Sequence, residues 1–171
     1  IHETKKRQFS NLKSRRAISR DGSHISLQAN VELPFEMKAV LESGAEGVGL
    51  LRSEFMFMNK EKMLTEDEQF LALKTIVKKM HGRPVTIRSL DLGADKLFYR
   101  PDMREVTTAI PALGIRGVRQ SLLNTGLLET QFKAMLRASI EGPIRILIPM
   151  VTNISEMKKI KSALNIAHRK L

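Results

Sequence analysis

The sequence predicts an α/β fold in which four short strands alternate with helices as consecutive parallel β–α units. Two observations predict it. Apolar runs of strand length alternate along the chain with longer segments of helical periodicity, an order typical of parallel β–α units. Helix start and stop signals bound these segments. With 171 residues, 42% of them hydrophobic, the chain is long enough to form one compact domain with a core.

The first unit is expected after a polar, basic segment over residues 3–16, which we interpret as a helical connector. Residues 25–31 alternate apolar and polar side chains, as a strand with one buried face does. The following helix is expected from Pro34, a residue favoured in the first helical turn, to about Ser43. Gly44 then provides a common helix stop.

The second unit begins with a short apolar strand over residues 47–51. Thr65 and Glu68 form a capping-box pattern, in which each side chain satisfies a backbone N–H at the start of a helix. The helix is expected to end at Gly82. Its predicted apolar stripe consists of Phe70, Leu73, Val77 and Met80.

The third and fourth units follow the same pattern. Residues 84–90 are expected to form a strand, followed by a long loop and two helices over residues 113–124 and 127–140. Residues 144–148 form a continuous apolar run, which predicts a strand buried on both faces. A second capping-box pattern over residues 153–156 opens the last helix. Its predicted inward-facing residues are Ile154, Met157, Ile160, Ala163 and Leu164.

Four β–α units amount to about half of a (β/α)₈ barrel, because a complete barrel takes about 250 residues. The alternative is a small open parallel sheet that is complete in itself. Hydrophobic periodicity does not separate these two architectures.

The net charge of +11 is concentrated at the two ends of the chain. Residues 1–20 hold seven cations and one acid, residues 157–171 hold five cations and no acid, and the charges between them sum to zero. A nucleic-acid interface is usually a basic patch on the folded body with aromatic residues for stacking, but the chain has one Tyr and no Trp. We therefore expect solvated chain ends and no nucleic-acid partner. Residues 1–18 are assigned to the basic connector and residues 19–171 to the α/β domain.

The absence of cysteine excludes disulfides and cysteine-based zinc sites and is typical of a cytoplasmic protein. No apolar run approaches the roughly 20 residues that a membrane helix needs, and no signal-peptide pattern is found. We expect a cytoplasmic protein without membrane insertion. The chain begins with Ile1 rather than Met, which favours a fragment of a longer protein.

Candidate site residues follow the predicted strands. Ligands of parallel α/β folds bind at the carboxyl ends of strands. Arginines there project into a polar pocket or are neutralised, and two converging guanidinium groups match a small molecule that bears phosphate and carboxylate. The residues at or just after the strand ends are Asn30, Arg52, Arg88, Asp91, Asp95 and Lys96.

The alternative to a ligand site is internal pairing, of Arg52 with Glu54 or another acid and of Arg88 with Asp91. Asp91 and Asp95 resemble a pair of metal ligands, but acids in such a D-x-G-x-D string more often form turns. The histidines lack partners at metal-ligand or catalytic spacing and are interpreted as surface residues. They are His2, His24, His81 and His168.

Five blocks of sequence, in the expected order, resemble Enzyme I of the bacterial sugar phosphotransferase system and its phosphoenolpyruvate-utilising relatives. The first reads G-A-E-G-V-G-L-L-R-S-E-F-M-F-M. One block alone would be weak evidence, but five in sequence are strong, and together they cover about residues 16–160. They lie at residues 44–58, 65–70, 87–96, 111–119, and 135–139 followed by 148–151. The R-S-E-F form and the short spacing are more similar to Enzyme I than to pyruvate phosphate dikinase or phosphoenolpyruvate synthase, which share the barrel.

The resemblance implies the first half of a phosphoenolpyruvate-binding (β/α)₈ barrel, also called a TIM barrel. It implies that Arg16, Arg52, Arg88 and Asn30 bind phosphoenolpyruvate. The family's Mg²⁺ ligands, its catalytic cysteine and its phosphorylated histidine have no counterparts here, so we expect no metal-ligating or catalytic residue in this chain. The Mg²⁺ ligands of the longer protein are expected after residue 171.

For that longer protein, the resemblance implies a kinase-type phosphotransferase. It would pass the phosphoryl group of phosphoenolpyruvate to its own histidine and then to a phosphocarrier protein for sugar uptake, and it would act as a homodimer. The chain alone is expected to be inactive. The alternatives are a fragment of pyruvate phosphate dikinase or phosphoenolpyruvate synthase, and a non-catalytic binding or assembly module.

The chain departs from the family pattern at two positions. Ile110 stands where Asn is usual before the proline of the fourth block, and Glu32 stands where Gly is common two residues after Asn30. Both departures affect local loop geometry and leave the resemblance intact.

Overall fold

The computed structural model describes residues 12–58, 60, 62–91 and 114–171. Of the predicted connector, residues 12–16 form a turn and a bend rather than the end of a helix. Ile18 and His24 then form an antiparallel bridge just before the first strand. The boundary expected at residue 18 stays a prediction.

One parallel sheet organises the chain. Its strands are β1 (Ala29–Val31), β2 (Val48–Arg52), β3 (Val85–Arg88) and β4 (Ile144–Leu147), and they lie side by side in chain order. Every neighbouring pair is parallel. The predicted α/β class and the four parallel strands are therefore confirmed.

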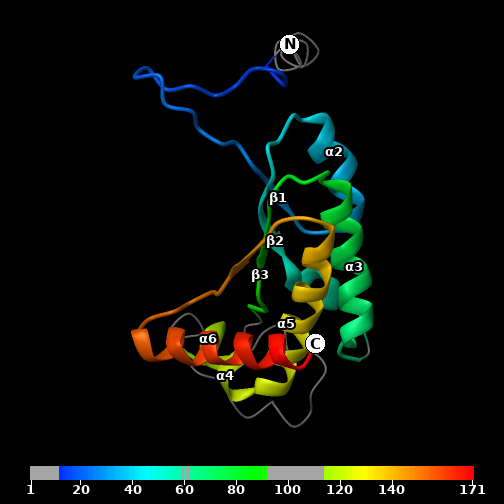
Figure 1. The fold of residues 1–171 in the computed structure, drawn as a ribbon, viewed down its shortest axis with the longest axis vertical. Helices are drawn as coiled ribbons and strands as arrows, with labels where there is room; N and C mark the ends of the chain where they lie inside the picture. Colours follow the sequence, from blue (N-terminus) through cyan, green and yellow to red (C-terminus); the bar gives the residue numbers. More distant parts are fainter. Residues whose placement is uncertain (1–11, 59, 61, 92–113) are drawn as a thin grey trace.

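Helices cover one face of this sheet. In Figure 1, α2, α3 and α5 lie on the same side of β1, β2 and β3, while α4 and α6 lie below the sheet. The helices, including the 3₁₀ segments labelled η, are η1 (Pro34–Glu36), α2 (Met37–Glu42), η2 (Ser53–Phe57), α3 (Glu66–Lys79), α4 (Val118–Leu123), α5 (Thr125–Ala138), η5 (Ser139–Glu141) and α6 (Ile154–Arg169).

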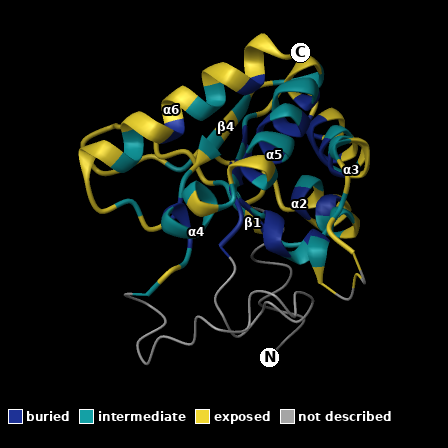
Figure 2. Ribbon diagram, turned by 90° about the horizontal axis from the view of Figure 1, so that it is seen from below, coloured by how far each residue is buried: buried dark blue, intermediate teal, exposed yellow. Residues whose placement is uncertain are grey.

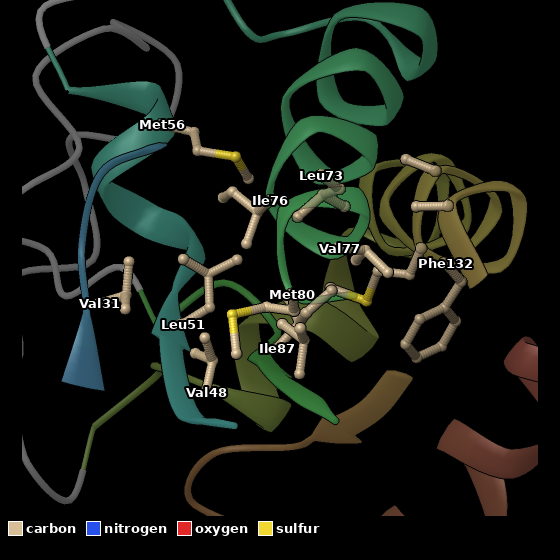
Figure 3. Close-up of a cluster of buried hydrophobic side chains, with 14 of the residues drawn as sticks. Val31, Val48, Leu51, Met56, Leu73, Ile76, Val77, Met80, Ile87 and Phe132 are labelled. Carbon is tan, nitrogen blue, oxygen red and sulfur yellow. The ribbon is translucent and has the colours of Figure 1, made fainter. Parts of the chain in front are cut away.

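The core lies between the sheet and α3 and α5. In Figure 3, Leu51 and Ile87 of the sheet face Ile76 and Met80 of α3, and all four side chains are fully buried. Burying a side chain of this kind stabilises the fold by about 1.5–3 kcal/mol. Of the predicted stripe on α3, Leu73, Val77 and Met80 are buried, whereas Phe70 is half-buried.

Both predicted capping boxes are present. At α3, Thr65 Oγ1 accepts from the Glu68 backbone N–H at 3.3 Å, and Glu68 Oε2 accepts from the Thr65 N–H at 2.8 Å. At α6, the side chains of Asn153 and Glu156 make the same reciprocal bonds. These interactions define where the two helices begin.

Two strand predictions were partly wrong. The first strand begins at Ala29 rather than at residue 25, and Ile25 and Leu27 are exposed. The fourth strand is not buried on both faces, because β4 is an outer strand of the sheet and its alternate residues are exposed. Leu147, for example, is 37% exposed. The sheet face opposite the helices is therefore open at this edge.

Helix α6 is amphipathic, and its inward face agrees with the prediction except at its first residue. Ile154, expected to point inward, is 76% exposed because it is the first residue of the helix. Ile160 is buried as predicted, Met157, Ala163 and Leu164 are half-buried, and Ala167, which was not predicted, is also buried. Figure 2 shows most of the outer face of α6 exposed. No helix in the described residues is both long and apolar enough to cross a membrane.

Candidate functional site

Arg52 and Arg88 end two neighbouring strands. Arg52 is the last residue of β2, Arg88 is the last residue of β3, and the two residues are register partners. Register partners on parallel strands point to the same face of a sheet. The structure therefore brings the two predicted arginines together at the carboxyl edge.

A β-bulge in β2 determines the face on which Arg52 lies. Val48 pairs with Val85, whereas Leu51, three positions later, pairs with Ile87, only two positions later on β3. The extra residue lets Val48 and Leu51 both be fully buried on the helix side. The next residue, Arg52, consequently lies on the open face together with Arg88.

Glu54 joins the two arginines. Its side chain is only 2% exposed, and its Oε1 accepts a hydrogen bond from Arg88 Nη2 and one from Arg52 Nε at 3.3 Å. Glu54 lies in η2, directly after β2. One buried carboxylate thus offsets the repulsion between two guanidinium groups and fixes where they converge.

Arg52 makes two further contacts besides that with Glu54. Arg52 Nη1 donates to Glu32 Oε1 at 2.5 Å, and its Cζ lies 4.5 Å from the ring centroid of Phe55. The Glu32 side chain is 39% exposed, so this ion pair faces solvent. The departure at Glu32 therefore lies directly at the candidate site.

Arg88 is linked to a third arginine through an acid. Asp91 lies 3.5 Å from Arg88 Nη1 and accepts from Arg116 Nε at 3.1 Å. Arg116 is followed by Gly117, whose φ is +54° and where a Cβ would lie 2.9 Å from both Met150 and the Pro149 carbonyl. Only glycine fits this position without strain.

The structure shows the internal pairing of the arginines, whereas ligand binding by them stays a prediction. They converge, as a ligand site requires, and the expected pairs Arg52–Glu54 and Arg88–Asp91 are also present. Among the described residues the cluster contains three arginines and three acids. We call it the arginine cluster, and its members are Glu32, Arg52, Glu54, Arg88, Asp91 and Arg116.

Asn30 shares the face of the arginine cluster, but Arg16 does not lie near it. Asn30 is exposed and pairs with Leu50, which is two residues before Arg52 and so on the same face. Arg16 lies at the opposite end of β2, close to Glu46. The pKa of Glu46 is lowered chiefly by a hydrogen bond from His24, and the charge of Arg16 contributes to the same lowering.

Sequence reasoning missed three residues of the site. Glu32 was noted only as a departure, Arg116 only as part of a motif, and Gln131 was not noted at all. Buried Gln131 contacts both arginine-bearing strand ends, and a polar residue among the apolar positions of α5 was the available signal. Asp95 and Lys96 lie outside the described residues.

The described residues do not offer a metal site. No group of three His, Cys, Asp or Glu side chains among them could hold a metal ion. The acids of the arginine cluster are each engaged with a guanidinium group. The guanidinium groups of the cluster supply N–H donors that suit an anion. Its carboxylates are already paired with these groups, so the cluster does not resemble a Mg²⁺ site.

Comparisons with known proteins point to one family. A family model described as "PEP-utilising enzyme, PEP-binding domain" matches residues 6–171. The chain is 47% identical over 169 residues to a phosphoenolpyruvate-protein phosphotransferase of Cupriavidus necator, a match that covers 97% of the chain and 28% of that relative. Proteins of the same name from Bacillus subtilis and Geobacillus stearothermophilus are 41% and 39% identical over 160 and 164 residues. These matches cover 93% and 95% of the chain and 28% of each relative. The chain therefore spans a little over a quarter of the length of these curated relatives.

Proposed function

Because the chain belongs to the family of PEP-utilising enzymes, through their PEP-binding domain, we propose that it is the phosphoenolpyruvate-binding part of a phosphoenolpyruvate-protein phosphotransferase. The resemblance seen in the sequence is confirmed by the family match and by the names of the relatives. The observation that carries the proposal is the convergence of Arg52 and Arg88 at the carboxyl edge of the sheet.

The chemistry of this edge matches phosphoenolpyruvate, which bears a phosphate and a carboxylate. A guanidinium group offers N–H donors in a planar fork that binds either anion bidentately. Arg52 is proposed to grip the phosphate, with Arg88 and Asn30 beside it. Arg16 was predicted as a further ligand, but its place at the opposite end of β2 gives that assignment no support.

The order of the strands supports a partial (β/α)₈ barrel. In an open doubly wound sheet the strand order reverses at a switch point and helices cover both faces. Here the order is β1-β2-β3-β4, and α2, α3 and α5 lie on one face. Successive right-handed crossovers without reversal produce this arrangement, which is that of consecutive units in a barrel.

The longer protein is proposed to carry the rest of the reaction. It would pass the phosphoryl group to its own histidine and then to a phosphocarrier protein for sugar uptake, with arginines offsetting the charge of the transferring group. Its Mg²⁺ ligands, its homodimer contacts and its cytoplasmic location belong to the same proposal. The dikinase alternative is not favoured, because the relatives reported above are named phosphotransferases.

The chain alone is proposed to bind phosphoenolpyruvate weakly and not to turn it over. A titration of the 171-residue chain, followed by NMR at the arginine Nε–Hε groups, tests this. We expect saturable shifts of Arg52 and Arg88 with a dissociation constant on the order of millimolar, and no release of pyruvate. Micromolar affinity would contradict the weak binding, and pyruvate release would contradict the inactivity, that we propose for the isolated chain.

Lysine substitutions test the two arginines individually. Arg52→Lys and Arg88→Lys keep the charge but remove the planar fork, so each is expected to weaken phosphoenolpyruvate binding about tenfold. Arg83→Lys is the matched control, because Arg83 donates to the Ala45 carbonyl at the amino end of the sheet. Absence of saturable binding, or equal weakening by all three substitutions, would refute the proposed site.

A further inference from the structure

A buried glutamine on α5 connects the two strand ends that carry the arginines. Gln131 is 1% exposed. Its Nε2 donates to Ser53 Oγ at 3.1 Å, and its Oε1 accepts from the Leu90 backbone N–H at 3.0 Å. Ser53 directly follows Arg52, and Leu90 is two residues after Arg88. One side-chain amide is thus bonded to both strand ends.

Ser53 closes this network onto the backbone of Arg88. Its hydroxyl donates to the Arg88 carbonyl at 2.6 Å, and its side chain is fully buried. The regular pairing of β2 with β3 ends at Arg52 and Arg88, because β2 passes into η2 at Ser53. The hydrogen bonds of Ser53 and Gln131 therefore continue the link between the strands beyond the last paired residues.

An apolar residue could occupy the position of Gln131 without making any of these hydrogen bonds. It lies among buried apolar residues of α5, including Leu128, Phe132 and Met135. A buried amide is costly unless it is hydrogen-bonded, whereas an apolar side chain there would need no partners. What the amide adds is a directional connection, since its bonds form only when both strand ends lie at the correct spacing.

We propose that Gln131 is a positioning residue that sets the spacing of Arg52 and Arg88. The inference rests on the anion site proposed above and identifies what holds its two guanidinium groups in place. Two guanidinium groups bind one small molecule well only when the distance between them matches the distance between its two anionic groups. A displacement of about 1 Å of a binding group at such a site can weaken its function up to about a hundredfold.

Gln131→Leu tests the proposal, with Gln69→Leu as its matched control. Gln69 is also fully buried, on α3, but its Nε2 donates to the carbonyl of Leu64, which precedes that helix. We expect Gln131→Leu to weaken phosphoenolpyruvate binding by the 171-residue chain about tenfold, and Gln69→Leu to change it less than twofold. Thermal unfolding of both variants compares their effects on stability.

A second variant removes the same link from the strand side. Ser53→Ala is expected to weaken binding as Gln131→Leu does, and the double variant is expected to be no weaker than either single one, because each breaks the same network. If Gln131→Leu does not fold, the binding affinity of Ser53→Ala tests the proposal by itself. Wild-type affinity in that variant would refute the positioning role.

The ligand-free protein provides a readout that separates this inference from the proposed function. The Nε–Hε resonances of Arg52 and Arg88 are expected to move in Gln131→Leu and to stay in place in Gln69→Leu. If the wild-type chain binds no phosphoenolpyruvate, the proposed function fails, and these resonances still test the positioning. Unmoved resonances, or equal binding by the two leucine variants, would overturn it.

Discussion

Glu32 and the proposed phosphate compete for the same guanidinium group. Glu32 Oε1 lies 2.5 Å from Arg52 Nη1, and both side chains are partly exposed. An exposed ion pair of this kind contributes about 0–1 kcal/mol. The pair is therefore weak enough to be displaced by an incoming anion, but its carboxylate also repels that anion.

Removing the charge of Glu32 should raise the affinity of the site. We expect Glu32→Gln to bind phosphoenolpyruvate about three- to fivefold more tightly, which corresponds to the loss of up to about 1 kcal/mol of competition and repulsion. The same titration measures it. Glu42→Gln is the control, because Glu42 is exposed on α2 and lies 4.0 Å from Lys38. Weaker binding by Glu32→Gln would show that Glu32 positions Arg52 instead.

At the residue scale, the sequence predicted the meeting of Arg52 and Arg88 because residues at the ends of neighbouring parallel strands share an edge. Their partners were harder to predict. Glu32 reaches Arg52 across 20 positions and Gln131 reaches Ser53 across 78 positions. Contacts of this kind depend on how whole elements pack, and no local pattern encodes them.

At the element scale, the two capping boxes couple helix stability to pH. The pKa of Glu68 is lowered chiefly by the hydrogen bond it accepts from the Thr65 backbone N–H, and then by the Thr65 hydroxyl. The pKa of Glu156 is lowered chiefly by the bond from the Thr152 backbone N–H. A carboxylate with a lowered pKa stabilises the fold above its ordinary value of 4.5, and this stabilisation is lost as the pH falls through the lowered pKa.

Substitution of the two glutamates should therefore flatten the acid side of the stability profile. Urea unfolding from about pH 7 to about pH 3 measures this effect. Glu68→Gln and Glu156→Gln are expected to lose less stability on acidification than the wild type. Near neutral pH each is expected to be less stable than the wild type, because a cap interaction is weakened. Glu42→Gln should keep the wild-type profile. Identical slopes in all four proteins would contradict the assigned role of the caps.

The helix starts were predictable because a capping box is local, with its two residues three positions apart. Strand limits were not. The alternation of residues 25–31 reads as one strand, but β1 includes only the part that lies beside β2. Likewise, the apolar run of β4 predicts burial on both faces, and its exposure follows from its place at the edge of the sheet.

At the scale of the whole molecule, the sheet has two outer strands and one open face. In the described part of the chain, β1 and β4 are bonded on one side only. Outer strands present unpaired backbone groups that readily pair with another chain. The exposed Arg145 gives β4 some protection through its charge, but the partly exposed Leu147 on the same face gives none.

We therefore expect the isolated chain to self-associate as its concentration rises. Light scattering should give a mass above that of the 19.3 kDa monomer at high concentration and a monomer mass on dilution. Leu147→Lys places a charge on the open face beside β4 and should shift the equilibrium toward monomer. Leu123→Lys, at an exposed position on α4, should leave it unchanged.

A monomer at every concentration would mean that the sheet edges do not drive association, which would argue against half-barrel pairing and the assembly-module alternative. Equal effects of the two lysines would assign the association to net charge instead.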